Sequence, residues 1–277
     1  MTQSGPVFAW SGGALTDDQK AALTAAGTLA LVKADSTGTG AGSVAWSYKV
    51  TDASLDFLAK DETLTVTYNV TINDGHGTTA AQPVTVTITG TNDTPTIVAG
   101  STTAIGAITE DAQGHETGHE TAAGTIAFND VDLNDTHTVS HEAPLFAWSG
   151  GPLSDGQIAV LAGSSTLTLV EADSTGTGAG SVGWTYQVDD SAIDFLAAGE
   201  TLTVAYNVTV TDNNGASITQ PLMLAVAGTG TNDAPVMVTV TAWLAGGPPW
   251  PSSTVTVYWT VSVSPFARKS NAPSAAE

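Results

Sequence analysis

Apolar and polar residues alternate along much of this chain. In the clearest run, apolar side chains occupy every second position and threonine or asparagine stands between them, at Leu64, Val66, Tyr68, Val70 and Ile72. A period of two places the apolar set on one face of an extended strand. The pattern therefore predicts a strand with one buried face, and it recurs at 44–50, 84–88, 126–128, 202–210 and 255–263.

Glycine-rich segments separate these runs, for example at 36–42 and 212–215, and they predict turns between strands. One short helix is expected in each half of the chain. Thr16 is suited to cap a helix, Asp17 and Asp18 complement its N-terminal dipole, and Gly27 is suited to end it; Ser154-Asp155 repeats the start. The pattern as a whole predicts an all-β protein of sandwich type.

The chain contains a long internal repeat. The segment FAWSGG begins at Phe8 and again at Phe146, an offset of 138 residues (146 − 8), and the same offset relates Trp46 to Trp184. The motif Thr-Asn-Asp-Xaa-Pro instead recurs with an offset of 140 residues (231 − 91), at 91–95 and 231–235. Two residues are therefore inserted near the last strand of the second copy.

This motif divides the chain if it closes each unit. Residues 1–95 are then a truncated sandwich repeat, whose opening strands, the counterpart of 101–142, are missing. Residues 96–235 form a complete repeat. Residues 236–277 do not follow the repeat and predict an irregular β-hairpin followed by a disordered tail. One hypothesis is that this hairpin covers the exposed edge of the first unit by strand addition.

Composition narrows the possible partners. Aspartate and glutamate outnumber lysine and arginine by 27 to 6, which gives a formal net charge of −21. Such a negative field repels phosphate backbones and anionic lipids, so nucleic acid is not expected as a partner, whereas divalent cations are expected ones. Acidity could also serve only to keep an exported protein soluble. Cysteine is absent, which excludes disulfides and thiolate zinc sites. No apolar run predicts membrane insertion, and no export signal is visible.

Three segments within the repeat carry a family resemblance: GTIAFNDVDLNDTHTVS at 124–140, GETLTVAYNVTVTDNNG at 199–215 and GTNDAPV at 230–236. Together they resemble the VCBS-type, cadherin-like repeats of large bacterial surface adhesins, over about residues 1–236. The resemblance implies tandem Ig/cadherin-like β-sandwiches, secretion, retention at the bacterial cell surface, and a role in attachment or biofilm formation.

The strongest candidate for ligand chemistry is the acidic segment that follows the run at 126–128. In an extended chain Asp130 and Asp132 project to one side, about 6.6 Å apart, while Val131 and Leu133 face the core. With Asp135 nearby, these oxygen ligands favour Ca²⁺ over a transition metal. The resemblance adds further interdomain ligands: Glu110, Asp111, Asn92, Asp93, Asn232 and Asp233. The alternative is that these residues only stabilise turns.

No catalytic constellation is predicted. The segment His115-Glu116-Thr117-Gly118-His119 matches the H-E-x-x-H zinc motif in letters. That motif needs a helix to place both histidines on one face, whereas here glycines bracket the segment and no apolar helical face accompanies it. It is interpreted as a loop. The tryptophans that repeat with the unit are expected to pack in the cores.

The expected function is that of a non-catalytic structural or adhesive repeat module, stiffened by Ca²⁺, in an extracellular adhesin. Its expected partners are neighbouring repeats of the same chain and a cell-surface glycan or protein. The alternative is an accessory glycan-binding module of an extracellular enzyme, because an exposed tryptophan can stack on a sugar ring.

Overall fold

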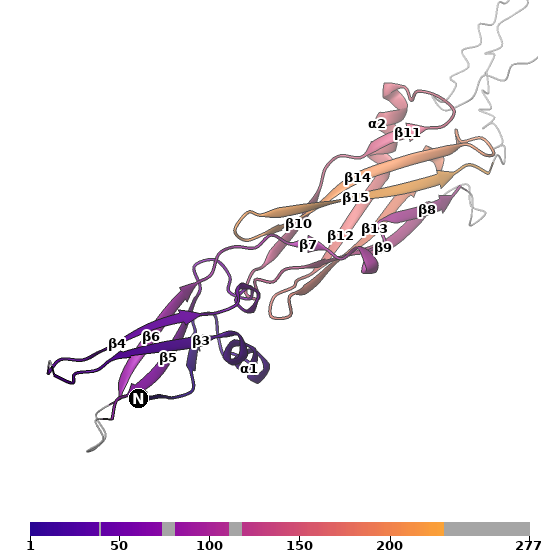
Figure 1. The fold of residues 1–277 in the computed structure, drawn as a ribbon. Coiled ribbons are helices and arrows are strands. Elements are labelled where there is room, and N and C mark those ends of the chain that lie inside the picture. Colours follow the sequence, from indigo (N-terminus) through magenta and orange to yellow (C-terminus); the bar gives the residue numbers. More distant parts are fainter. Residues whose placement is uncertain (39, 74–80, 111–117, 230–277) are drawn as a thin grey trace, which may run out of the picture.

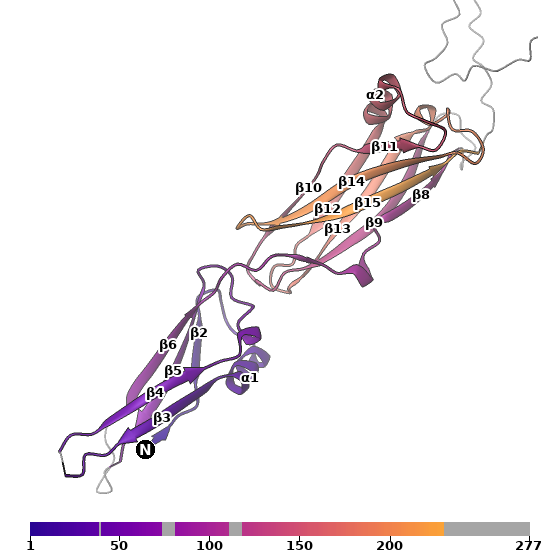
Figure 2. The ribbon, with the colours of Figure 1, turned by 45° about the horizontal axis from the view of Figure 1, so that its top comes forward.

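The computed structural model describes residues 1–38, 40–73, 81–110 and 118–229, which form two elongated β units placed end to end (Figure 1). Turning the molecule shows the same succession of the units along one long axis (Figure 2). The architecture is mostly antiparallel β, with two short α-helices. The predicted all-β fold with one short helix per unit is therefore confirmed.

The first unit has strand β5 at the centre of its main sheet. Strands β1 and β2 pair with one edge of β5 and β6 pairs with the other, all antiparallel, and β3 and β4 form a separate two-stranded sheet. The bounds of these elements are β1 (Thr2–Gln3), β2 (Val7–Trp10), α1 (Asp17–Ala26), β3 (Thr28–Ala34), β4 (Ser43–Lys49), η1 (Asp52–Ser54), β5 (Thr63–Thr71) and β6 (Gln82–Thr89).

The second unit has two fuller sheets. One has the order β10-β14-β15-β8, with β11 also on β14, and the other has the order β12-β13-β9-β7. All pairs are antiparallel except β15 with β8. The bounds are β7 (Thr96–Ile97), η2 (Ala99–Ser101), β8 (Ile105–Thr109), β9 (His119–Asn129), β10 (His137–His141), β11 (Leu145–Trp148), α2 (Asp155–Ser164), β12 (Ser165–Ala172), β13 (Ala179–Asp189), η3 (Asp190–Ala192), β14 (Thr201–Asp212) and β15 (Ser217–Ala227).

Alternation explains how each unit builds its core. In β5 the buried positions are the apolar ones, and in β14 the same pattern continues to Val210. Two separate hydrophobic clusters result, one in each unit. The cluster of the second unit is the larger, because β8 and β9 add Ile108, Ile126 and Phe128 to it. The apolar burial that stabilises the fold is therefore unequal between the two units.

Both helices begin where their capping residues predict. The Thr16 hydroxyl accepts a hydrogen bond from the Gln19 backbone N–H, and the Gln19 side chain accepts one from the Thr16 backbone, which completes a capping box. Ser154 and Gln157 form the same box at α2. These reciprocal bonds satisfy N–H groups that the first helical turn leaves without partners.

The strand register refines two details of the repeat. Strand β1 pairs Thr2 with Thr71 as β10 pairs Ser140 with Thr209, so β1 is the counterpart of the end of β10. Gly90 and Gly228 occupy the same place beside Asp61 and Gly199. The offset of 138 therefore holds through the last strand, and the two-residue insertion follows that strand. The predicted hairpin and tail at 236–277 lie outside the described residues.

Candidate metal centre at the joint

Three segments converge where the two units meet. They are the linker between β6 and β7, the loop between β9 and β10, and the tip of the β14–β15 hairpin (Figure 1). The loop supplies Asp130, Asp132 and Asp135, all of which are buried, and the hairpin supplies the buried Asp212. The predicted acidic segment thus lies inside the joint.

The side chains of this loop point the opposite way from the prediction. Asp130 and Asp132 are buried, whereas Val131 is exposed and Leu133 is only partly buried. The reason is that two local hydrogen bonds bend the loop. The Asp132 N–H donates to the Asp130 side chain, at Oδ1, at 3.0 Å, and the Asp135 N–H donates to the Asp132 backbone carbonyl at 3.1 Å. Such turns gather carboxylates on their inner side.

The three carboxylates of Asp130, Asp135 and Asp212 are close enough to share one cation. Each offers an oxygen that lies within 4.8 Å of an oxygen from both others. Asp212 is held in place by the backbone N–H groups of Asn214 and Ala216, which donate to its Oδ1 at 2.8 and 2.9 Å. The Asn214 amide donates to Asp135 Oδ2 at 2.9 Å. The hairpin tip therefore orients two of the three carboxylates.

Among the residues that the structure describes, two buried oxygens at the joint have no hydrogen-bond partner. Asp132 is fully buried, its Oδ2 accepts a hydrogen bond from the Asp93 N–H at 2.7 Å, and its Oδ1 accepts none. The Asn92 amide donates to Asp212 Oδ2 at 2.9 Å, and its buried Oδ1 also lacks a partner. Buried polar atoms are nearly always satisfied, so unpartnered oxygens among carboxylates are the pattern that a bound cation explains.

The electrostatics of the joint are unfavourable without a cation. Burial, together with the neighbouring charges of Asp130, Asp135 and Asp93, raises the pKa of Asp132 to about 7, although the Asp93 N–H opposes the shift. Burial and the charges of Asp130 and Asp212 likewise raise the pKa of Asp135. A divalent cation would remove this repulsion and favour the ionised forms.

A buried histidine contacts the acidic loop through Asp130. His137 Nε2 lies 2.9 Å from Asp130 Oδ2, and its Nδ1 lies 2.9 Å from Asp173 Oδ1. Two carboxylate acceptors need two N–H donors, which only the protonated imidazole has. Burial alone would lower the pKa of His137, but the hydrogen bonds that its ring donates to Asp173 and Asp130 raise it. The imidazolium thus offsets part of the negative charge and fixes the orientation of Asp130.

The first unit also contacts this loop. The Asn134 amide donates to the Gly12 carbonyl at 3.0 Å and to Glu62 Oε1 at 2.6 Å, and the Leu133 N–H donates to the Phe57 carbonyl at 3.4 Å. Burial, followed by the charges of residues that include Asp56 and Asp52, raises the pKa of Asp93. Acidic groups of both units therefore face the linker.

The other residues named from the sequence lie elsewhere. Glu110 is buried at the far end of the second unit, where its Oε2 accepts a hydrogen bond from the Thr229 N–H at 3.1 Å. It therefore does not join the cluster at 130–135. Asp111, Asn232 and Asp233 lie outside the described residues, as do residues 115–117 of the H-E-x-x-H match. His119, the last residue of that match, begins strand β9.

Asp212, His137 and Asp173 were not predicted as site residues. Asp212 stands at the start of an Asp-Asn-Asn-Gly turn, and such a residue is usually only a turn signal. His137 and Asp173 are brought together by pairing between segments that are distant in sequence. The one usable signal was His137 itself, since it is a titratable residue two positions after the acidic segment at 130–135.

No family model matches the chain, and no characterised protein matches it by sequence. Among solved structures it is similar to CfaE, the adhesive subunit of the CFA/I fimbria of enterotoxigenic Escherichia coli, with 9% identity and a TM-score of 0.34 over 66% of this chain and 63% of that one. It is also similar to the cadherin-like domains 1 to 4 of zebrafish RET, with 10% identity and a TM-score of 0.31 over 74% of this chain and 41% of that one. The similarity to the CupB6 tip adhesin of Pseudomonas aeruginosa has 10% identity and a TM-score of 0.24 over 69% of this chain and 70% of that one.

The chain spans less than two thirds of CfaE and of the RET domains. Likenesses at these scores are too distant to indicate a function. Among the described residues, no helix is long and apolar enough to cross a membrane.

Proposed function

We propose that this chain is a non-catalytic structural and adhesive repeat module of an extracellular bacterial surface protein, and that Ca²⁺ binding stiffens the joint between its two units. The observation that supports this function most strongly is the buried acidic cluster at the joint. A reaction centre would need a nucleophile or a general acid with access to substrate, whereas these carboxylates are buried between two sandwiches.

The donor set fits a hard cation. The oxygens of Asp130, Asp135 and Asp212 lie within reach of one another, and the unpartnered oxygens of Asp132 and Asn92 lie at the same joint. These residues would hold Ca²⁺, which takes six to eight oxygen ligands, including amide and carbonyl oxygens as well as carboxylates. Bound Ca²⁺ supplies positive charge that offsets carboxylate repulsion and a set of bonds that links the segments.

The mechanical consequence follows from where the ligands originate. Asp130, Asp132 and Asp135 belong to the second unit, and Asn92 lies on the linker that leads from the first. A cation that binds both restricts the hinge, since any bend at the linker would move ligands apart. In a tandem array of such repeats, stiff joints would extend the molecule away from the cell surface. We propose that the chain belongs to such an array at the bacterial cell surface, and that its partners include neighbouring repeats of the same protein.

Calcium titration of the full chain tests this function. Calorimetry should show Ca²⁺ uptake, and small-angle scattering should show a narrower distribution of distances between the units in Ca²⁺ than in EDTA. Asp212→Asn keeps an oxygen for the N–H groups of Asn214 and Ala216 but removes a charged ligand, so it should weaken Ca²⁺ binding. Asp18→Asn, at an exposed position in α1, is the matched control. Identical scattering profiles in Ca²⁺ and EDTA would contradict the proposal.

Glycan binding is the second candidate, and one observation gives it a location. Trp46 is 50% exposed and lies beside Gln82 and Thr85 on the first unit. An exposed indole ring with polar neighbours can stack on a sugar. A glycan array probed with the full chain and with Trp46→Ala separates the two functions. Binding that is lost in Trp46→Ala would favour the accessory module, and Ca²⁺-dependent stiffening would favour the stalk.

A further inference from the structure

The two units differ in how many strands cover their apolar faces. In the second unit β9 pairs with β13 over its whole length, and β8 pairs in parallel with β15. The offset of 138 makes β4 and β6 the counterparts of β13 and β15. Among the described residues, β4 pairs only with β3, and β6 pairs only with β5. The described strands therefore leave two strand edges of the first unit without a partner.

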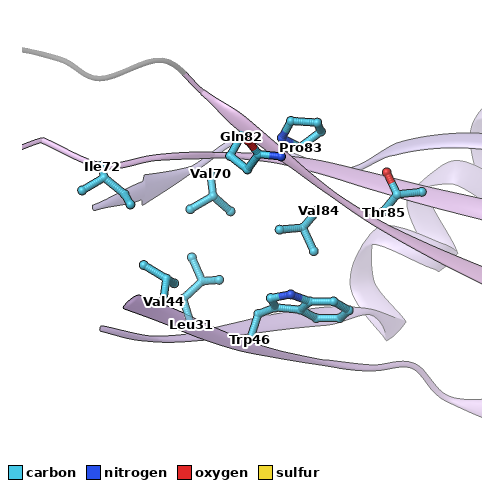
Figure 3. A pocket seen from close by; sticks show the side chains of 9 residues that line it. All are labelled: Leu31, Val44, Trp46, Val70, Ile72, Gln82, Pro83, Val84 and Thr85. Carbon is cyan, nitrogen blue, oxygen red and sulfur yellow. The ribbon is translucent and has the colours of Figure 1, made fainter. Parts of the chain in front are cut away.

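The unpaired edges border an apolar groove. Its volume is about 360 Å³, and its walls come from β3 and β4 on one side and from β5 and β6 on the other. Figure 3 shows side chains from both walls projecting into the space between them, among them Trp46 and Val84. The lining residues are Leu31, Val44, Trp46, Val70, Ile72, Gln82, Pro83, Val84 and Thr85.

Two of these positions are exposed in the first unit but buried in the second. Trp184, the counterpart of Trp46, is 1% exposed, against 50% for Trp46. Val210, the counterpart of Ile72, is also 1% exposed, against 41% for Ile72. The first unit thus carries a core-type apolar face that its own described strands leave uncovered. Burying a large side chain of this kind is strongly favourable, so the open face is suited to receive a partner.

The second unit shows what complements such a face. The Trp184 indole N–H donates to the Thr103 carbonyl at 2.7 Å. Gly124 of β9 lies against the ring so closely that an added Cβ would lie 2.6 Å from Trp184 Cζ2, and Gly106 of β8 packs on the far edge of the same ring. The complement of this tryptophan is therefore a pair of strands that presents glycines to the ring and a carbonyl to its N–H.

We propose that the open face of the first unit receives a strand pair of the kind that opens this repeat, a segment with the sequence pattern of residues 101–129. Its β9-like strand adds antiparallel to β4, and its β8-like strand adds parallel to β6. The added strands satisfy the free N–H and C=O groups of two edges while they bury the groove. The proposal does not depend on calcium binding at the joint.

The repeat fixes the register of this addition. In the second unit Gly124 lies opposite Trp184, and Thr125 lies opposite Gly183. By the same offset, the glycine of the incoming strand lies opposite Trp46, and the residue after it lies opposite Ala45. A shift by one residue would place a side chain on the ring and turn the apolar positions outward. The addition should therefore occur in one register.

The absence of cysteine from the chain permits a direct test by crosslinking. The full chain with Ala45→Cys is mixed with a synthetic peptide of residues 101–129 that carries Thr125→Cys or, as the off-register control, Thr121→Cys. Ala45 is exposed, so the substitution leaves the fold intact. We expect disulfide formation with the Thr125→Cys peptide to exceed that with the control about tenfold or more, since a disulfide needs Cβ atoms about 4 Å apart.

A second peptide tests the contact with the ring. Adding Gly124→Phe to the Thr125→Cys peptide should lower crosslinking about tenfold or more, because the added ring overpacks the site over Trp46. Equal crosslinking in both registers, or no effect of Gly124→Phe, overturns the proposal. So does crosslinking that appears only after removal of 236–277, which would make that segment the occupant. Glycan binding that is lost in Trp46→Ala would make the groove a sugar site instead.

Discussion

The substitution Asp132→Asn should change the stability of this protein in opposite directions with and without Ca²⁺. Asparagine has the same shape as aspartate, and its side-chain oxygen can still accept the hydrogen bond from the Asp93 N–H. Its amide group can donate into the cluster of Asp130 and Asp135. The substitution therefore removes a buried charge without removing the hydrogen bond that fixes the side chain.

The pKa of Asp132 gives the magnitude for the metal-free protein. That pKa is raised from 3.8 to about 7, chiefly by burial, so the folded state favours the protonated acid. Its contribution to stability is complete below about pH 4 and is lost as the pH rises to about 7. At about 1.4 kcal/mol per pH unit, the loss amounts to at most about 4 kcal/mol. Asp132→Asn avoids this loss, so at pH 8 in EDTA it should raise the free energy of unfolding by about 1–4 kcal/mol.

Calcium should reverse the order of the two proteins. At a Ca²⁺ concentration about 1,000 times its Kd, binding stabilises the wild type by about 4.1 kcal/mol. This exceeds the advantage of about 1–4 kcal/mol that Asp132→Asn has in EDTA, and the variant should lose most of the Ca²⁺ gain. Calorimetric unfolding measures the stability of both proteins under three conditions: in EDTA at pH 4.5, in EDTA at pH 8, and in Ca²⁺ at pH 8. At pH 4.5 the two proteins should be nearly equal. Destabilisation by Asp132→Asn in EDTA at pH 8, or equal stabilisation of both proteins by Ca²⁺, would refute the reasoning.

Four further substitutions test the fold and the joint. Trp184→Ala should destabilise the second unit by about 3–5 kcal/mol in urea denaturation because it empties a buried site, whereas Trp46→Ala should cost about 1 kcal/mol or less because its ring is half exposed; equal costs would contradict the open face. Ser154→Ala should cost about 1 kcal/mol, since it removes the cap of α2; an unchanged midpoint would mean that the cap contributes nothing. Asn134→Ala should broaden the distances between the units in scattering without altering the unfolding of either; a shifted unfolding curve would assign Asn134 to the core of one unit.

The sequence predicted the strands and helices well because their signals are local. The alternation at 64–70 specifies a buried face whatever its neighbours are, and Thr16 followed by Asp17 and Asp18 specifies a helix start within three residues. Trp46 shows the limit of this reasoning. It has the same local pattern as Trp184, yet it is half exposed, because its burial depends on strands that would come from a distant part of the repeat.

The candidate site was only partly predictable for a related reason. Asp130, Asp132 and Asp135 could be found because they are close in sequence, whereas Asp212 reaches them through the strand pairing of β10 with β14. The internal repeat did not help to identify the residues of the site. Asp35, the counterpart of Asp173, forms a surface ion pair with Lys33 at 2.6 Å, and the lysine chiefly lowers the pKa of Asp35 to about 2. The same residue in the same motif therefore has a different role in each unit.

One stretch of the repeat accounts for both differences between the units. Residues 101–138 supply β8 and β9, which cover the apolar face, and also the acidic loop with His137, which forms the joint. The described residues of the first unit include no counterpart of this stretch, so they leave the apolar face open and hold no acidic loop of this kind. A strand pair added to the first unit by a longer segment would also bring a second acidic loop to the end of that unit, beside Asp35. Strand addition and cation binding would then be coupled, because each added segment would carry most of the ligands for the next joint.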